Sequence, residues 1–191
     1  DFIQKELLPS LHKEFPLHKN ARSHCLIGAS SGGYGALHHV SLPGSEFGVA
    51  IAIAPDSYFE ASLLPDIYKM APYMKEFSDL EKIKKFLRAE DWRKKKNFFP
   101  ILNALAMTLC YGTLDGKKLR FPIDDQTGEV RAKVWNEILQ KDPVFFLTER
   151  SNPLKGKIIY LDVGAFDDFS LYFGARRIRD ILKKRKIALA Y

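Results

Sequence analysis

The chain has 191 residues, which is the size of one domain and is long enough to bury a hydrophobic core. Its composition, 46% hydrophobic and 28% charged, is typical of an ordinary globular protein. Two cysteines, Cys25 and Cys110, exclude a disulfide framework and a cysteine-based zinc site. No apolar run reaches the roughly 18 residues that a membrane-spanning helix needs, so we expect no membrane span.

The formal net charge of +7 raises the question of a nucleic-acid partner. The excess is concentrated in the runs RKKK (93–96) and KKRK (183–186). The second run closes a predicted helix, where cations are stabilised by the negative end of the helix dipole. No helix-turn-helix, RNA-recognition or zinc-finger signature accompanies either run. We therefore expect solvated surface here and no nucleic acid among the partners.

The first residues, DFIQKELLPSL, begin without Met and already follow a helical pattern. Apolar residues recur at helical spacing from Ile3 to Phe15, which predicts an amphipathic helix that Pro16 ends. We expect the chain to be a piece of a longer protein. The absence of a targeting segment therefore gives no information about the compartment.

Strand and helix patterns alternate at both ends of the sequence. We expect strands at 21–29, 47–55, 156–164 and 187–191, and helices after the first and third of these. The strands are short continuous apolar runs, typical of a parallel sheet covered on both faces, and Cys25 is expected to be a small core residue. These features predict an α/β, doubly wound architecture.

The middle of the chain has a different pattern. Residues 56–153 hold predicted helices, one of them with Ser78 as its expected N-cap, and are too many for a connecting loop. We interpret this segment as a helical cap laid over the sheet. The expected organisation is one domain, incomplete at both ends, with core segments at 1–55 and 154–191 and the cap at 56–153.

The glycine-rich stretch HCLIGASSGGYG (24–35) allows two interpretations. As a dinucleotide-binding turn of a short-chain dehydrogenase, it has Gly28 and Gly32 in place but Tyr34 where a third glycine is needed. Asp56 comes late for the acidic residue that would bind the ribose, and no Tyr-x-x-x-Lys pair is present. An NAD(P)-dependent oxidoreductase is therefore an alternative and not our first choice.

As a nucleophile turn, the same stretch fits better. Residues 28–32 read G-x-S-x-G between a strand and a helix, which is the pattern that presents a serine on a strained, sharp turn. We expect Ser30 to be the nucleophile and the backbone N–H of Ser31 to contribute to an oxyanion hole. A turn with no chemistry, in a non-catalytic binding module, is the structural alternative.

A serine nucleophile needs a base and an acid that orients the base. In α/β-hydrolases the acid follows the serine in the chain and comes after a later strand. Asp167 and Asp168 come directly after the predicted strand at 156–164. Asp56 is a further candidate, and Asp168 could instead cap the next helix.

The segments RSHCLIGASSGGYGALHHVSLPGSEFGVAIAIAP and IIYLDVGAFDDFSLYFGARRIRDIL resemble the esterase family of α/β-hydrolases that includes S-formylglutathione hydrolase (esterase D), feruloyl esterases and ferric-enterobactin esterases. The resemblance implies a mostly parallel sheet with flanking helices. It places the family's G-x-S-x-G-G on residues 28–33 and its acid, in a G-x-x-D pattern, on Asp167 in preference to Asp168.

The resemblance also implies a serine hydrolase of small-molecule esters or thioesters that needs neither a metal nor an organic cofactor. The family's catalytic histidine follows one more strand, and the sequence stops inside that strand at Tyr191. The five histidines present, His12, His18, His24, His38 and His39, all lie near or before the serine, so we expect the catalytic histidine outside this chain.

Overall fold

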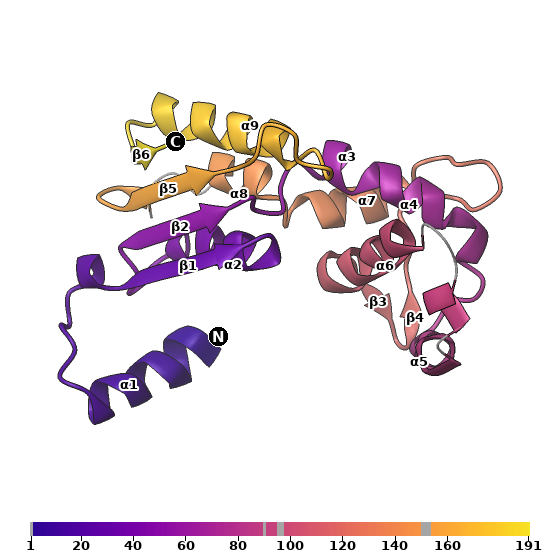
Figure 1. The fold of residues 1–191 in the computed structure, drawn as a ribbon, viewed down its shortest axis with the longest axis horizontal. Coiled ribbons are helices and arrows are strands. Elements are labelled where there is room, and N and C mark those ends of the chain that lie inside the picture. Colours follow the sequence, from indigo (N-terminus) through magenta and orange to yellow (C-terminus); the bar gives the residue numbers. More distant parts are fainter. Residues whose placement is uncertain (1, 90, 95–97, 150–153) are drawn as a thin grey trace. The chain divides into compact units, whose positions relative to one another are not determined.

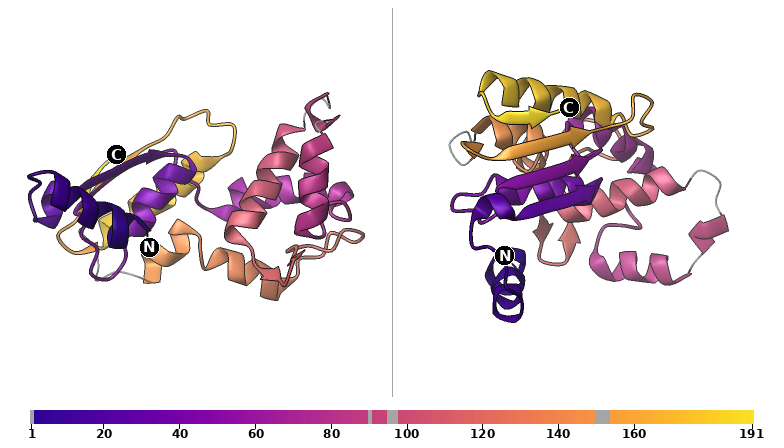
Figure 2. Two further views of the ribbon diagram at one scale, coloured as in Figure 1. Left: turned by 90° about the horizontal axis from the view of Figure 1, so that it is seen from below. Right: turned by 60° about the vertical axis from the view of Figure 1, so that its left-hand side comes forward.

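A computed structural model describes residues 2–89, 91–94, 98–149 and 154–191. The chain forms two compact units, of which the first comprises residues 1–58 and 143–191 and the second residues 59–142. The ribbon in Figures 1 and 2 shows the elements of both units.

The first unit is a parallel sheet with helices. Its strands are β1 (Cys25–Ala29), β2 (Val49–Ile53), β5 (Ile158–Asp162) and β6 (Ala188–Ala190), in the order β1-β2-β5-β6. Its helices are α1 (Leu8–Glu14), α2 (Ser31–Val40), α8 (Pro143–Glu149) and α9 (Leu171–Lys184), with a π-helical turn at Ile3–Leu7 and a 3-10 turn at Ala21–Ser23. All the strand pairs are parallel, which confirms the predicted α/β class.

One face of this sheet carries the core of the unit. Ala50, Ala52, Ile159 and Leu161 alternate along β2 and β5 and are at most 1% exposed, and they belong to one cluster with apolar side chains of α2, α8 and α9. The burial of alternate residues follows from the period of two in a strand. This cluster fixes the register in which the ends of β1, β2 and β5 meet.

The other face of the sheet differs from our expectation. Ile27 is 68% exposed, and Ile158 and Tyr160 are also exposed, so the described residues do not cover this face. Cys25 is exposed as well, because it lies on this face of β1 two residues before Ile27, and the prediction of a core cysteine was wrong.

The second unit is mainly helical. It contains α3 (Phe59–Ser62), α4 (Leu64–Met70), α5 (Leu80–Ala89), α6 (Phe99–Tyr111), α7 (Ala132–Leu139), the short strands β3 (Leu114–Asp115) and β4 (Lys118–Leu119), and 3-10 turns at Ala71–Tyr73 and Asp91–Lys94. Its largest fully buried side chains include Phe59, Ile67, Phe77 and Tyr111. Its place as a cap over the sheet stays a prediction.

Two local features of the second unit depend on carboxylates. The N-cap of α5 is Asp79, whose Oδ1 accepts hydrogen bonds from the backbone N–H groups of Glu81 and Lys82 at 3.0 and 2.9 Å. The predicted cap, Ser78, is one residue too early. Asp142 is 2% exposed and accepts a 2.6 Å hydrogen bond from the backbone N–H of Phe59, which joins the two ends of the unit.

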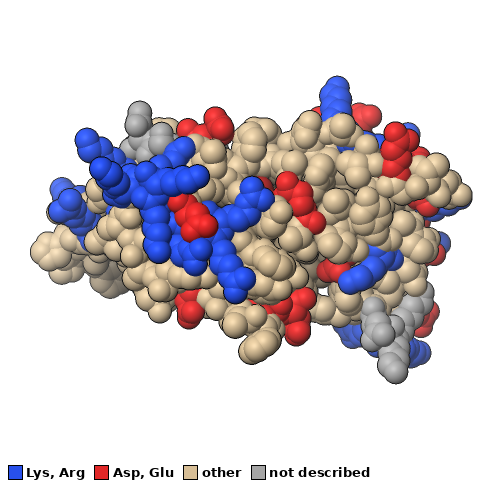
Figure 3. Space-filling model, turned by 90° about the horizontal axis from the view of Figure 1, so that it is seen from above, with Lys and Arg blue, Asp and Glu red and all other residues tan. Residues whose placement is uncertain are grey.

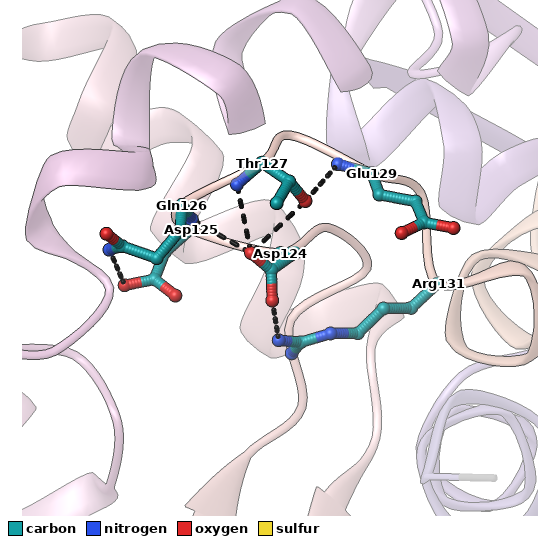
Figure 4. A network of polar contacts seen from close by, with 6 residues as sticks. All are labelled: Asp124, Asp125, Gln126, Thr127, Glu129 and Arg131. Carbon is teal, nitrogen blue, oxygen red and sulfur yellow. Dashed lines mark hydrogen bonds and ion pairs between the residues drawn. The ribbon is translucent and has the colours of Figure 1, made fainter.

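A loop near α7 is held by the carboxylate of Asp124 (Figure 4). Its Oδ1 accepts hydrogen bonds from the backbone N–H groups of Thr127 and Gln126, and its Oδ2 accepts a 3.0 Å bond from Arg131. These bonds lower the pKa of Asp124 from 3.8 to about 2, the two backbone donors contributing most. The Asp124 carboxylate therefore binds a proton less readily in the folded protein than in the unfolded chain.

We expect the stability of Asp124→Asn to fall less between neutral and acid pH than that of the wild type. Because the folded-state pKa is depressed, the Asp124 carboxylate stabilises the fold above about pH 4 and this stabilisation is lost as the pH falls toward 2. Melting temperatures of both proteins, measured between pH 7 and pH 2, should differ at neutral pH and converge in acid. A difference that stays constant with pH would contradict this role.

Candidate active site

Ser30 lies in the sharp turn between β1 and α2, with φ 54° and ψ −121°. A residue with a side chain rarely adopts a positive φ, so this backbone is strained and must be held by its surroundings. The Ser30 N–H donates to the Ile53 carbonyl at 2.9 Å, and the Ser30 carbonyl accepts from the N–H of Tyr34 at 2.9 Å. The strand β2 and the first turn of α2 thus hold the turn from both sides.

The two flanking glycines have different roles. A Cβ on Gly28 would lie 2.8 Å from the Gly32 Cα and still closer to the Gly32 carbonyl group, so no side chain fits at Gly28. A Cβ on Gly32 would meet nothing within 4 Å. The close packing of the turn therefore requires a glycine at residue 28 and not at residue 32. Gly33 is also confined, because its Cβ would lie 3.0 Å from the Ile53 carbonyl oxygen.

The Ser30 hydroxyl has a carboxylate partner. Its Oγ donates a hydrogen bond to Oδ1 of Asp56 at 3.1 Å, and Asp56 is 4% exposed while Ser30 is exposed. In a triad, the imidazole lies between the acid and the serine. A carboxylate that touches the serine directly leaves no space for an imidazole between them, so this geometry does not fit Asp56 as the acid that orients a histidine.

The segment that carries Asp56 is itself strained and tightly packed. Ala54 and Tyr58 have φ values of 41° and 54°. The Ala54 N–H donates to the Asp162 carbonyl at 2.6 Å, and Gly174 of α9 has no room for a Cβ, which would lie 2.9 Å from the Ser57 Cβ. Strain of this kind persists where the surroundings over-determine the backbone, and such positions gather at functional sites.

Asp167 lies after β5 and is fixed by the start of α9. Its Oδ1 accepts hydrogen bonds from the backbone N–H groups of Phe169 and Leu171 at 3.0 and 2.9 Å. No described residue bonds its Oδ2, which leaves this oxygen able to accept from an imidazole N–H. Asp168 is exposed, and Asp167, not Asp168, makes the capping contacts that we had considered for Asp168.

The parallel register brings Ser30 and Asp167 to one edge of the sheet. Ala29, Ile53 and Asp162 are aligned at the carboxyl ends of β1, β2 and β5, so both residues follow strand ends on this edge. Strands are about 4.8 Å apart, which places the ends of β1 and β5 roughly 10 Å from each other.

Ser31 is the first residue of α2, whose first N–H groups have no carbonyl partner within the helix. The positive end of the helix dipole therefore lies next to Ser30. An oxygen that gains negative charge at this point would be stabilised by both effects.

The histidines lie away from this edge. The rings of His12 and His24 meet with centroids 5.1 Å apart, beside the start of β1 and so at the opposite end of that strand. His38 and His39 lie in the last turn of α2, and the ring of His38 stacks on Tyr34. His18 precedes β1 in the chain.

Neither a metal centre nor a membrane span is found among the described residues. No three His, Cys, Asp or Glu side chains in these ranges are grouped so that they could hold a metal ion. Within the same ranges, no helix is long and apolar enough to cross a bilayer.

Comparison with known proteins gives one family and two similar structures. The family described as "Putative esterase" matches residues 1–187. A ferulic acid esterase is 14% identical over 98% of this chain and 49% of its own, with a TM-score of 0.50. S-formylglutathione hydrolase (FrmB) from Staphylococcus aureus is 16% identical over 96% of this chain and 51% of its own, with a TM-score of 0.47. The chain thus spans about half the length of each structure, and no curated protein matches it.

We expect the two glycines of the turn to respond in opposite ways to alanine. Gly28→Ala should lower the free energy of unfolding by about 1–3 kcal/mol, because the added methyl group overlaps the Gly32 backbone. Gly32→Ala should raise it by about 0.5 kcal/mol, because the methyl group enters open space and the unfolded chain loses freedom. Urea unfolding of the two variants measures both values. Equal losses in both would contradict the asymmetry.

Proposed function

Since the chain belongs to this esterase family, we propose that the whole protein is a serine hydrolase of carboxylic esters. The observation that carries the proposal is the strained backbone of Ser30, at a strand-to-helix turn with the N-terminus of α2 beside it. The substrate class is a small-molecule ester or thioester. The dehydrogenase alternative is weakened by the family and by Asp56, whose carboxylate contacts Ser30.

In the proposed reaction, Ser30 attacks the acyl carbon while a histidine outside residues 1–191 takes the hydroxyl proton. The tetrahedral intermediate places its negative oxygen by the N–H of Ser31, and the histidine returns the proton to the leaving alcohol or thiol. Water, activated by the same histidine, then hydrolyses the acyl-Ser30 ester. No step requires a metal or an organic cofactor.

Asp167 orients the histidine in this proposal. Its Oδ1 is fixed by two backbone N–H groups, those of Phe169 and Leu171. Its Oδ2 accepts the Nδ1–H of the histidine, so that Nε2 faces Ser30. Asp56 holds the hydroxyl of Ser30 until the histidine replaces it as the acceptor, which means that the serine proton changes partner when the site becomes competent.

Ser30 and Ser31 give a matched test of the nucleophile. Hydrolysis of p-nitrophenyl acetate by the whole protein should fall by about 10⁴-fold or more in Ser30→Ala. Ser31→Ala should retain most of the activity, because Ser31 contributes its backbone N–H and not its hydroxyl. Activity that survives in Ser30→Ala but not in Ser31→Ala would overturn the assignment.

The neighbouring aspartates test the acid. We expect Asp167→Asn to lower kcat by roughly 10³- to 10⁴-fold, because the amide cannot hold the histidine in the required tautomer. Asp168→Asn should stay within about threefold of the wild type, since Asp168 is exposed. A large loss of kcat in Asp168→Asn, with a normal kcat in Asp167→Asn, would assign the role of the acid to Asp168 instead.

A further inference from the structure

The positive charge of the chain is concentrated on α9 and the residues that follow it. Residues 176–186 contain seven Lys or Arg side chains and one carboxylate, a formal charge of +6 out of the chain's +7. Figure 3 shows these blue side chains gathered on one face, over α9. This segment therefore accounts for most of the net positive charge of the chain.

Stabilisation of the helix does not account for this concentration. Cations interact favourably with the helix dipole only in the last turn. Arg176, Arg177 and Arg179 lie in the middle of α9, and Arg179 and Lys183 form a like-charged pair at i,i+4 spacing, which destabilises a helix. The helix dipole therefore does not account for the three arginines in the middle of α9.

A pocket of about 430 Å³ lies between α8 and α9 within this charged region. Its cationic lining residues are Arg177, Lys184 and Arg185. Val144, Thr148 and Ile181 contribute apolar and hydroxyl surface, and Asp180 is the one acidic side chain in the lining. Three cations facing one concave space create a positive potential that a small anion would relieve.

Arg185 is held in place at this pocket by one side of its guanidinium. Its Nη2 donates to the backbone carbonyl of Thr148, whereas its Nη1 is buried and has no hydrogen-bond partner among the described residues. The Thr148 carbonyl thus holds the Arg185 side chain at the wall of the pocket. The pKa of Asp180 is lowered by the hydrogen bond from Arg179 and further by the charges of Lys183 and Lys184, as expected in a positive field.

We propose that this pocket binds a ligand with a phosphate or pyrophosphate group, held by Arg177, Lys184 and Arg185. Guanidinium groups donate in a planar fork that matches phosphate oxygens, and a polyphosphate supplies the two or more negative charges that three cations call for. Val144 and Ile181 then contact the part of the ligand next to the phosphate. The site is independent of the proposed hydrolase function.

A pair of variants with the same spacing tests the pocket. Arg177→Gln with Lys184→Gln removes two lining cations, and Arg176→Gln with Lys183→Gln removes two cations from the same helix that do not line the pocket. We expect calorimetric titration with inorganic pyrophosphate at 150 mM salt to show binding to the wild-type chain. The first pair should weaken it about tenfold or more and the control pair by less than about threefold.

Phosphatidic acid vesicles, with phosphatidylcholine vesicles as the blank, test whether a lipid headgroup is the source of the phosphate. If the wild type and the control pair sediment with the phosphatidic acid vesicles and the first pair does not, the result supports the pocket with a lipid ligand. Equal losses in the two pairs would show a diffuse charged surface and overturn the proposal. An absence of both pyrophosphate and vesicle binding by the wild-type chain would also overturn it. Arg177 lies over the Tyr58 ring and Arg176 lies over the Tyr172 ring, so each pair of substitutions removes one such contact. Melting curves verify that both double variants are folded.

Discussion

The candidate site depends on the close approach of the Gly28 backbone to the Gly32 backbone. This contact allows β1 to pass directly into α2, and it forces Ser30 into a backbone conformation that a serine would not adopt in an ordinary loop. The cost is offset by hydrogen bonds from β2 and from the first turn of α2. As a result, the hydroxyl, the free N–H groups of the helix and the end of the neighbouring strand come to one point.

The sheet extends this local arrangement to Asp167. The parallel register aligns the carboxyl ends of β1, β2 and β5, so the residues after each strand meet at one edge although they are far apart in the sequence. Asp56 follows β2 and contacts Ser30 directly, whereas Asp167 follows β5 and lies one strand further away. Two carboxylates at one edge thus have different relations to the serine because they follow different strands.

The features that the sequence predicts well are those set by neighbouring residues. The G-x-S-x-G turn, the apolar strands around it and the helix after Asp167 all follow from short patterns, and the structure contains them. The contact between Ser30 and Asp56 could not be predicted, because it depends on the pairing of β2 with β1. Short sequence patterns do not determine the order of strands in a sheet. The exposure of Cys25 could not be predicted either, because it depends on which face of the sheet the described helices cover. The displaced cap, Asp79 instead of Ser78, reflects the competition of two adjacent cap-forming residues.

Covalent labelling is the direct test of whether Ser30 is a nucleophile. The whole protein would be treated with a fluorophosphonate probe and the modified peptide identified by mass spectrometry. We expect a single adduct on Ser30, formed at a rate that falls when Asp167 is changed to Asn. An adduct on Ser31, or an intact protein that hydrolyses esters without labelling at Ser30, would contradict it.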